Sequence, residues 1–283
     1  MTHLVSINKL ANQRVLLIGG TSGVGFAVAR AALEHGANIV LSSSNPLKVS
    51  SAVSRLKTLY PEPSYTNRIT GFACDLGDQA TMEANLIALL QYSTTPSLFP
   101  SPSPTPTDQT LTPLDHIIYT SGTRPPPTPV SSPTVTPSTF TTSGTLRVIA
   151  PILLGKHAKT YLRDTSSTSL TFTSGILGQK PVPGMALGAA MGTALDGLTR
   201  ALAVELAPMR VNTVSLGAVE TELFEGFGEQ KEMYLGVFRK GTLSGELGRP
   251  EDVAEAYVWC MKDRFVTGER ISSDGGWMLK GVF

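Results

Sequence analysis

The chain has 283 residues, of which 41% are hydrophobic, and its formal net charge at pH 7 is +1. A charge so close to zero argues against charge-driven binding to nucleic acid or to a membrane surface. The two cysteines, Cys74 and Cys260, lie far apart without metal-ligand spacing, so we expect a reduced compartment and no metal. The first residues lack an apolar stretch behind a basic start, and no window of about 18 apolar residues is free of charge. We therefore expect a cytoplasmic protein.

Apolar runs typical of buried strands alternate with segments of helical periodicity along most of the chain. This alternation predicts an α/β fold in which helices cover both faces of a doubly wound parallel sheet. Seven strands fit a single Rossmann-type domain over residues 1–283 better than two domains. The predicted strands are 14–19, 38–42, 69–74, 116–120, 169–173, 210–214 and 270–272. The predicted helices are 25–35, 46–59, 79–91, 145–162, 184–207 and 250–261.

Two stretches rich in Pro, Ser and Thr, 93–113 and 123–138, interrupt the alternation. Proline cannot donate to a strand ladder or sit inside a helix, so both stretches are predicted to be loop insertions. A Pro-rich arm that docks a partner protein is the alternative interpretation.

A glycine-rich run follows the first strand and opens the first helix, Ile18-Gly-Gly-Thr-Ser-Gly-Val-Gly25. Glycines in such a turn let the backbone approach a pyrophosphate, which the helix N-terminus then stabilises. Taken alone, the run also fits a purely structural turn. The residues predicted to contact a dinucleotide here are Gly19, Thr21, Ser22, Gly23, Val24 and Gly25.

The glycine run resembles the fingerprint of the short-chain dehydrogenase/reductase family, and other segments extend the resemblance over most of the chain. They are Cys74-Asp75-Leu76, Tyr119-Thr120-Ser121-Gly122, and the stretches 197–221, 248–260 and 267–279. The resemblance implies a Rossmann fold with a nicotinamide cofactor. It also implies cofactor contacts for Asp75, Leu76, Ser121, Gly122, Val219 and Thr221.

The end of the second strand bears on the choice between NAD and NADP. An acidic residue at this position binds the ribose hydroxyls and repels a 2′-phosphate. This chain instead reads Ser43-Ser44-Asn45, with Lys48 nearby. Hydroxyl and amide groups can donate to a phosphate, so we expect NADP, although the Arg usual in the family is absent from position 44.

The resemblance also identifies the positions where the family carries its catalytic groups. Aligning back from 197–208 puts Gly188 at the Tyr and Gly192 at the Lys of the family's Tyr-x-x-x-Lys pair. Neither glycine can donate a proton. Ser174 falls at the family's Ser position and Arg147 at its Asn position, and we predict both as catalytic residues. A strand-end cap for Ser174 and a solvated Arg147 are the alternatives.

Loss of the proton donor favours an acceptor that needs none. Hydride addition to an iminium gives a neutral amine, whereas carbonyl reduction develops an alkoxide. We therefore predict an NADPH-dependent reductase of secondary metabolism, acting on an iminium-like acceptor and similar to fungal alkaloid-pathway members that couple reduction to cycloaddition. A redox-silent cyclase or isomerase and a non-enzymatic NADP-binding scaffold are the alternatives.

The remaining expectations concern partners and substitute acids. Aromatic and apolar residues in 222–247 suggest a bulky, largely apolar small-molecule substrate, although packing of a short amphipathic helix explains them too. The resemblance implies a homodimer or homotetramer. Side chains that could replace the missing acid are Tyr119, Arg124, Lys156, Tyr161, Asp164 and Lys180.

Overall fold

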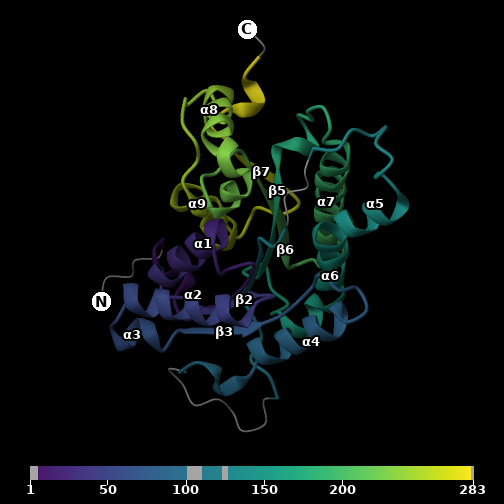
Figure 1. Ribbon diagram of the computed structural model, residues 1–283. Coiled ribbons are helices and arrows are strands. Elements are labelled where there is room, and N and C mark those ends of the chain that lie inside the picture. The colour runs from purple at the N-terminus through teal and green to yellow at the C-terminus, as the bar shows by residue number, and fades with distance from the viewer. Residues whose placement is uncertain (1–5, 101–109, 123–126, 282–283) are drawn as a thin grey trace.

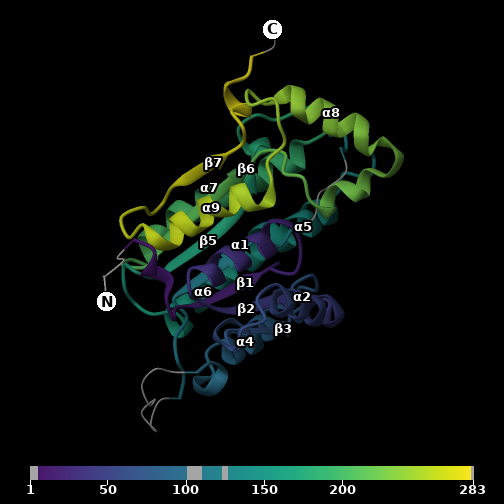
Figure 2. The same ribbon diagram turned by 90° about the vertical axis from the view of Figure 1, so that its left-hand side faces the viewer.

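The computed structural model describes residues 6–100, 110–122 and 127–281. Within them, seven parallel strands form one sheet in the order β3-β2-β1-β4-β5-β6-β7. Figure 1 and Figure 2 show helices on both faces of this sheet. The strands are β1 (Arg14–Ile18), β2 (Asn38–Ser43), β3 (Ile69–Ala73), β4 (His116–Tyr119), β5 (Ser169–Gly175), β6 (Arg210–Leu216) and β7 (Arg270–Ser273). The predicted doubly wound α/β fold is confirmed.

Each predicted strand is present with ends within two residues of those expected. The helices are α1 (Gly23–Glu34), α2 (Pro46–Leu59), α3 (Pro63–Thr66), α4 (Met82–Ser93), α5 (Pro137–Gly144), α6 (Ala150–Tyr161), α7 (Ala186–Glu205), α8 (Lys231–Gly241) and α9 (Pro250–Lys262). None of the helices in the described ranges is long and apolar enough to cross a membrane.

The sheet is apolar on both faces, as a covered parallel sheet must be. Along β1, all five residues are buried, and their side chains alternate between two clusters. Leu16 and Ile18 join the core beneath α4, α6 and α7, whereas Val15 and Leu17 join the core beneath α1, α2 and α9. This alternation fixes the register of the central strand and therefore the place where its carboxyl end delivers the glycine turn.

One prediction about the second Pro-rich stretch is wrong at its end. We expected a loop up to residue 138 and a helix from 145, but α5 begins at Pro137. The Thr136 side chain accepts a hydrogen bond from the Thr139 amide. The Thr139 side chain in turn accepts one from the Thr136 amide, and the pair forms a capping box. Proline at the first helical position suits this start, since its missing N–H would have no partner there.

The first Pro-rich stretch is only partly described, and 101–109 lie outside the described residues. At its beginning, the guanidinium of Arg14 donates to the carbonyls of Ser93, Thr95 and Pro96. The Thr112 amide donates to the Thr94 carbonyl at 2.7 Å and closes the base of the insertion. The insertion therefore leaves from the amino end of the sheet.

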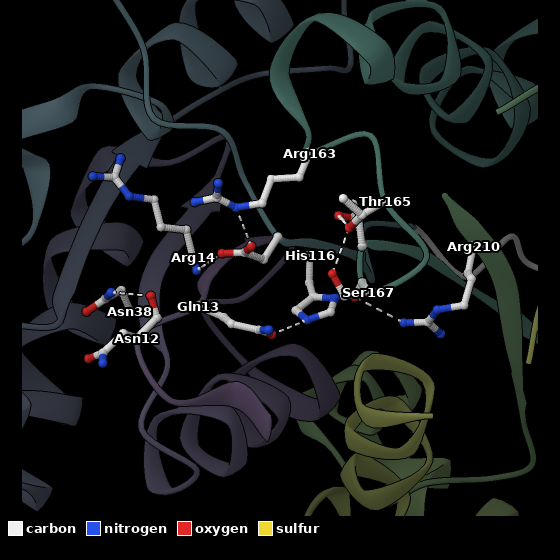
Figure 3. A network of polar contacts seen from close by, with 11 residues as sticks. Asn12, Gln13, Arg14, Asn38, His116, Arg163, Thr165, Ser167 and Arg210 are labelled. Carbon is white, nitrogen blue, oxygen red and sulfur yellow. Dashed lines mark hydrogen bonds and ion pairs between the residues drawn. The ribbon is translucent and has the colours of Figure 1, made fainter. Parts of the chain in front are cut away.

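A buried polar layer at that amino end contains His116, the first residue of β4 (Figure 3). Its Nδ1 lies 2.8 Å from Ser169 Oγ and its Nε2 lies 2.6 Å from Gln13 Oε1. Because Gln13 Oε1 can only accept, this contact fits a ring that carries a proton on Nε2. Burial, reinforced by the charge of Arg210, lowers the pKa of His116 from 6.5 to about 3.

We expect this histidine to make the fold acid-sensitive. Between pH 6.5 and 3 the unfolded chain binds a proton at His116 that the folded chain does not, so stability falls as pH falls. We expect the free energy of unfolding, measured with urea, to fall between pH 7 and pH 5 in the parent. In His116→Gln this fall should be smaller by up to about 2 kcal/mol. Equal pH dependence of His116→Gln and the parent would refute the assignment.

Candidate active site

The glycine-rich turn connects β1 to α1 at the carboxyl end of the sheet. Gly19 has φ +92°, and a Cβ built on it would lie 2.7 Å from the Ser121 amide nitrogen. A Cβ on Gly25 would lie 2.3 Å from the Gly19 carbonyl oxygen. The Gly19 amide donates to the Ser42 carbonyl at 2.8 Å. Larger residues are therefore excluded where the turn passes between the ends of β2 and β4.

The turn places the N-terminus of α1 at the carboxyl ends of β1 and β4, where the connections that follow these two strands run in opposite directions. The chain turns from β1 toward β2 and β3 on one side and later places β4 on the other, which makes this edge a topological switch point. Ser22 is the N-cap of α1, but its side chain accepts no hydrogen bond from the helix amides in the described structure. These amides are the donors that a dinucleotide pyrophosphate requires, so Thr21, Ser22, Gly23 and Val24 fit the predicted cofactor.

The loop after β6 returns to the same turn. A Cβ on Gly23 would lie 3.1 Å from Thr221 Cγ2, so Thr221 stands directly beside the turn. Val219 is buried and pairs with Gly248, whose amide donates to the Ala218 carbonyl at 3.0 Å. The loop containing Val219 and Thr221 is thus held against α1, where a nicotinamide-contacting loop is expected.

The ends of β2 and β3 form the adenosine side of the predicted site. Ser43 is half-buried, and Ser44 and Asn45 are exposed. Asn45 caps α2, because its Oδ1 accepts from the amides of Leu47 and Lys48. Its contribution to a ribose phosphate would therefore come from Nδ2. No carboxylate follows β2 before α2 begins.

Asp75 and Leu76 follow β3 and differ in exposure. Asp75 is exposed, and its Oδ1 accepts from the Gly77 amide at 2.8 Å. Leu76 is buried in the core beneath α4. Ser121 and Gly122 follow β4 on the opposite side of the glycine turn. The structure thus gathers every predicted cofactor residue along the carboxyl edge of the sheet.

Ser174 lies at this edge near the end of β5 and is buried. A Cβ built on Gly192 of α7 would lie 3.4 Å from Ser174 Oγ. The same Cβ would lie 3.4 Å from the Cα of Gly178, an ordinary van der Waals distance. Gly192 of α7 is therefore the residue next to the Ser174 hydroxyl, and it presents no side chain to that hydroxyl.

Arg147 lies over the loop that follows β4. A Cβ built on Gly122 would lie 3.4 Å from both Cζ and Nη2 of Arg147, so the guanidinium covers this glycine. Burial lowers the pKa of Arg147, although it stays a cation, since free guanidinium titrates above the physiological range. The guanidinium of Arg147 therefore lies against the loop after β4, and its catalytic role stays a prediction. A cation and a serine hydroxyl are thereby placed at the ends of neighbouring strands.

Arg147 belongs to an irregular helical turn that the sequence did not reveal. Residues Thr145–Ile149 form a π-helical turn between α5 and α6. Gln79 Nε2 donates to Thr145 Oγ1 at 2.7 Å and braces this turn from the segment before α4. π-Helical turns concentrate at functional sites because the inserted residue redirects the side chains near it.

The other side chains predicted as substitute acids lie elsewhere or are engaged. Tyr119 is buried, and its hydroxyl donates to the Leu146 carbonyl at 2.6 Å. Lys156 pairs with Glu83, and Lys180 Nζ donates to the carbonyls of Trp277 and Lys280. Tyr161 is the last residue of α6 and Asp164 lies in the loop before β5, both at the amino end of the sheet. Arg124 lies outside the described residues.

The aromatic segment after β6 forms a small unit above the carboxyl edge, seen around α8 in Figure 2. The rings of Phe227 and Tyr234 stack at 4.2 Å, and Phe224 and Phe238 meet at 5.6 Å. Trp277 packs so closely on α8 that a Cβ on Gly241 would lie 2.1 Å from its ring. Much of the aromatic content therefore packs on itself, as the amphipathic-helix alternative supposed.

The described residues contain no group of three or more His, Cys, Asp or Glu arranged to hold a metal ion. Both cysteines are buried free thiols. The geometry at the carboxyl edge is thus that of a dinucleotide site flanked by a hydroxyl and a guanidinium.

Comparison with known proteins agrees with this geometry. The model of an SDR-like Rossmann domain matches residues 6–280. A short-chain dehydrogenase/reductase from Stachybotrys chlorohalonatus, ATR9, is 38% identical over 96% of this chain and 99% of its own. The structure of the MalC reductase/Diels-Alderase from Malbranchea aurantiaca superposes with a TM-score of 0.86 at 35% identity, covering 97% of this chain and 100% of that one. On this evidence the chain belongs to the short-chain dehydrogenase/reductase family.

Proposed function

We propose that this protein is an NADPH-dependent reductase that acts on an iminium-like acceptor in secondary metabolism. The proposal rests on the glycine next to the Ser174 hydroxyl, since a Cβ on Gly192 would lie 3.4 Å from Ser174 Oγ. Aligning 197–208 with the family pattern puts Gly188 and Gly192 at its Tyr and Lys positions. The reductase part of the name of the Malbranchea relative supports the same reaction class.

Bound NADPH would supply a hydride to an electrophilic carbon. When the acceptor is C=N⁺, the π electrons move to nitrogen and a neutral amine results, so no side chain has to deliver a proton. A ketone would instead develop an alkoxide that must be protonated, and glycines at the family's Tyr and Lys positions cannot deliver that proton. We therefore favour an acceptor whose reduction needs no proton from the protein.

Arg147 has a separate task in this proposal. A guanidinium over Gly122 would repel an iminium unless an anion lies between the two cations. A substrate carrying both a carboxylate and an iminium resolves this conflict, since Arg147 can bind the carboxylate bidentately and leave the iminium carbon for hydride attack. The proposed substrate is therefore a cyclic imine that bears an acidic group.

The reaction class is tested by offering the NADPH-loaded protein 3,4-dihydroisoquinoline and the similarly sized ketone 1-tetralone, neither of which carries a carboxylate. The proposal expects NADPH oxidation with the imine and almost none with the ketone. Cyclisation in the same pocket is a second candidate, favoured by the Diels-Alderase part of the relative's name. It predicts conversion of a diene substrate in the presence of NADP⁺, without NADPH consumption.

The NADP preference has its own test at the end of β2. Without a carboxylate at positions 43–45, NADPH should bind at least several-fold more tightly than NADH in calorimetric titrations. Ser44→Asp should weaken NADPH by roughly tenfold and change NADH much less, because the new charge repels only the 2′-phosphate. Ser51→Asp, on an exposed position of α2, is the matched control and should leave both affinities unchanged. Equal affinity of the parent for both nucleotides would contradict the assignment.

A further inference from the structure

We propose that Tyr119 is a positioning residue whose hydroxyl holds the π-helical turn that places Arg147 over Gly122. The Tyr119 hydroxyl donates to the carbonyl oxygen of Leu146 at 2.6 Å, and Leu146 is the residue directly before Arg147. The inference deepens the role proposed above for Arg147. It replaces the interpretation of Tyr119 as a substitute proton donor.

The sequence of the turn explains why Leu146 needs a donor from outside its helix. In a regular α-helix, the amide of Ala150 would donate to the Leu146 carbonyl, but here it donates to the Thr145 carbonyl. Continuing the π pattern would require the amide of residue 151, and this residue is Pro151, which has no N–H. The Tyr119 hydroxyl supplies the donor that the helix cannot.

Burial and ring packing fix the position of the Tyr119 side chain. Its side chain is fully buried on β4, and its ring meets the ring of Phe172 edge-on at a centroid distance of 6.3 Å. Burial raises the pKa of the phenol, so the hydroxyl keeps its proton. That single proton is directed at the Leu146 carbonyl and is not available to a substrate.

A second hydrogen bond also holds the π-helical turn, and it is accepted by a different atom from the one that Tyr119 contacts. Gln79 donates to the Thr145 side chain, whereas Tyr119 donates to the backbone one residue further on. A Cβ on Gly144 would lie 3.4 Å from Met191 Sδ of α7, so the start of the turn also packs against the helix that carries Gly192. Removing the Tyr119 hydroxyl would free the part of the turn nearest Arg147 while Thr145 stays braced.

Tyr119→Phe tests the inference because it keeps the ring against Phe172 and removes only the hydroxyl. Tyr257→Phe is the matched control, since Tyr257 is equally buried and its hydroxyl lies 2.8 Å from Thr173 Oγ1 on the other face of the sheet. Both variants lose one buried hydrogen bond and should lose similar stability.

The deciding readout is modification of Arg147 by phenylglyoxal, followed by peptide mass mapping. Tyr119→Phe should raise the reaction rate of Arg147 roughly fivefold or more, while Tyr257→Phe leaves it unchanged. The buried arginines Arg14 and Arg210 serve as internal references and should not change in either variant. A crystal structure of Tyr119→Phe should show a displaced Arg147 side chain. Unchanged Arg147 reactivity in Tyr119→Phe would overturn the inference.

Steady-state kinetics separate this inference from the proposed function. Tyr119→Phe should raise KM for 3,4-dihydroisoquinoline-3-carboxylate more than it lowers kcat, and should change neither constant for 3,4-dihydroisoquinoline, which lacks the carboxylate. If Arg147 becomes reactive but KM for the carboxylate does not change, Tyr119 still positions Arg147 and the proposed anion-binding role is wrong.

Discussion

Arg147→Ala should lower kcat/KM for a carboxylate-bearing cyclic imine by roughly 10- to 100-fold, the effect of losing a charge-assisted hydrogen-bond pair. The expectation follows from the guanidinium that covers Gly122 at the end of β4. Without it, the substrate carboxylate would have no fixed cation, and the iminium carbon would be poorly placed for hydride transfer. The measurement is the initial rate of NADPH oxidation with 3,4-dihydroisoquinoline-3-carboxylate.

The same variant should bind NADPH within about twofold of the parent, because the predicted dinucleotide contacts come from other loops. Arg147→Lys should recover part of the activity, since it keeps the charge but loses the planar fork. Arg200→Ala, on an exposed position of α7, is the matched control and should be fully active. Full activity of Arg147→Ala on the carboxylate substrate would show that the guanidinium has no part in the reaction.

Discrimination between an imine and a ketone should be the largest effect of all. General acid catalysis typically contributes about 10²- to 10⁴-fold, so 1-tetralone should be reduced more slowly than the imine by a factor of that order. The structural reason is Gly192, which places a hydrogen atom where a side chain would otherwise approach Ser174 Oγ. The comparison uses NADPH oxidation at saturating cofactor, at a pH where the imine is protonated.

Introducing the missing groups provides the reciprocal test. Gly188→Tyr combined with Gly192→Lys should raise ketone reduction if Ser174 is correctly placed for it. The Cβ at position 192 would make ordinary contacts of 3.4 Å with Gly178 and Ser174, so the backbone can accept that substitution. Gly192→Lys alone is the control and should not reduce ketones. Rapid ketone reduction by the parent protein would mean that another side chain already supplies the proton.

The strands and the glycine turn could be predicted because their signals are local. Buried parallel strands require continuous apolar runs such as Val15 to Ile18, and a tight turn requires glycine at a position such as Gly19 with positive φ. The position of Arg147 was predicted from the family resemblance, by aligning back from residues 150–154, and its role in the reaction stays a prediction. The carboxyl edge of the sheet then gathers residues from separate loops without further information.

The π-helical turn could not be predicted, because its cause is divided between distant parts of the chain. Pro151 removes an amide, and that signal is visible in the sequence, but the donor that compensates comes from Tyr119 on β4. Periodicity carries no information about which tyrosine will face which carbonyl. The early start at Pro137 was missed for a different reason: the many prolines nearby outweighed the cap at Thr136.

Helix α8 shows a third kind of limit. The apolar residues of 222–247, the segment that contains α8, fit both a substrate-binding segment and a packed helix, and only the tertiary structure shows Phe224, Leu235 and Leu247 buried together. Trp277 contacts Gly241 although it lies 36 residues further along the chain. Such a contact depends on where the C-terminal segment lies after β7, and no local pattern encodes it.

The most direct test of the proposed reaction is deuterium transfer from NADPH labelled at C4 of the nicotinamide. Incubation with 3,4-dihydroisoquinoline-3-carboxylate, using each C4 epimer in turn, should give a cyclic amine with one deuterium at C1 from one epimer only. Mass spectrometry of the product measures this transfer. Consumption of the imine without deuterium in the product, or deuterium transfer to 1-tetralone at a comparable rate, would contradict the proposal.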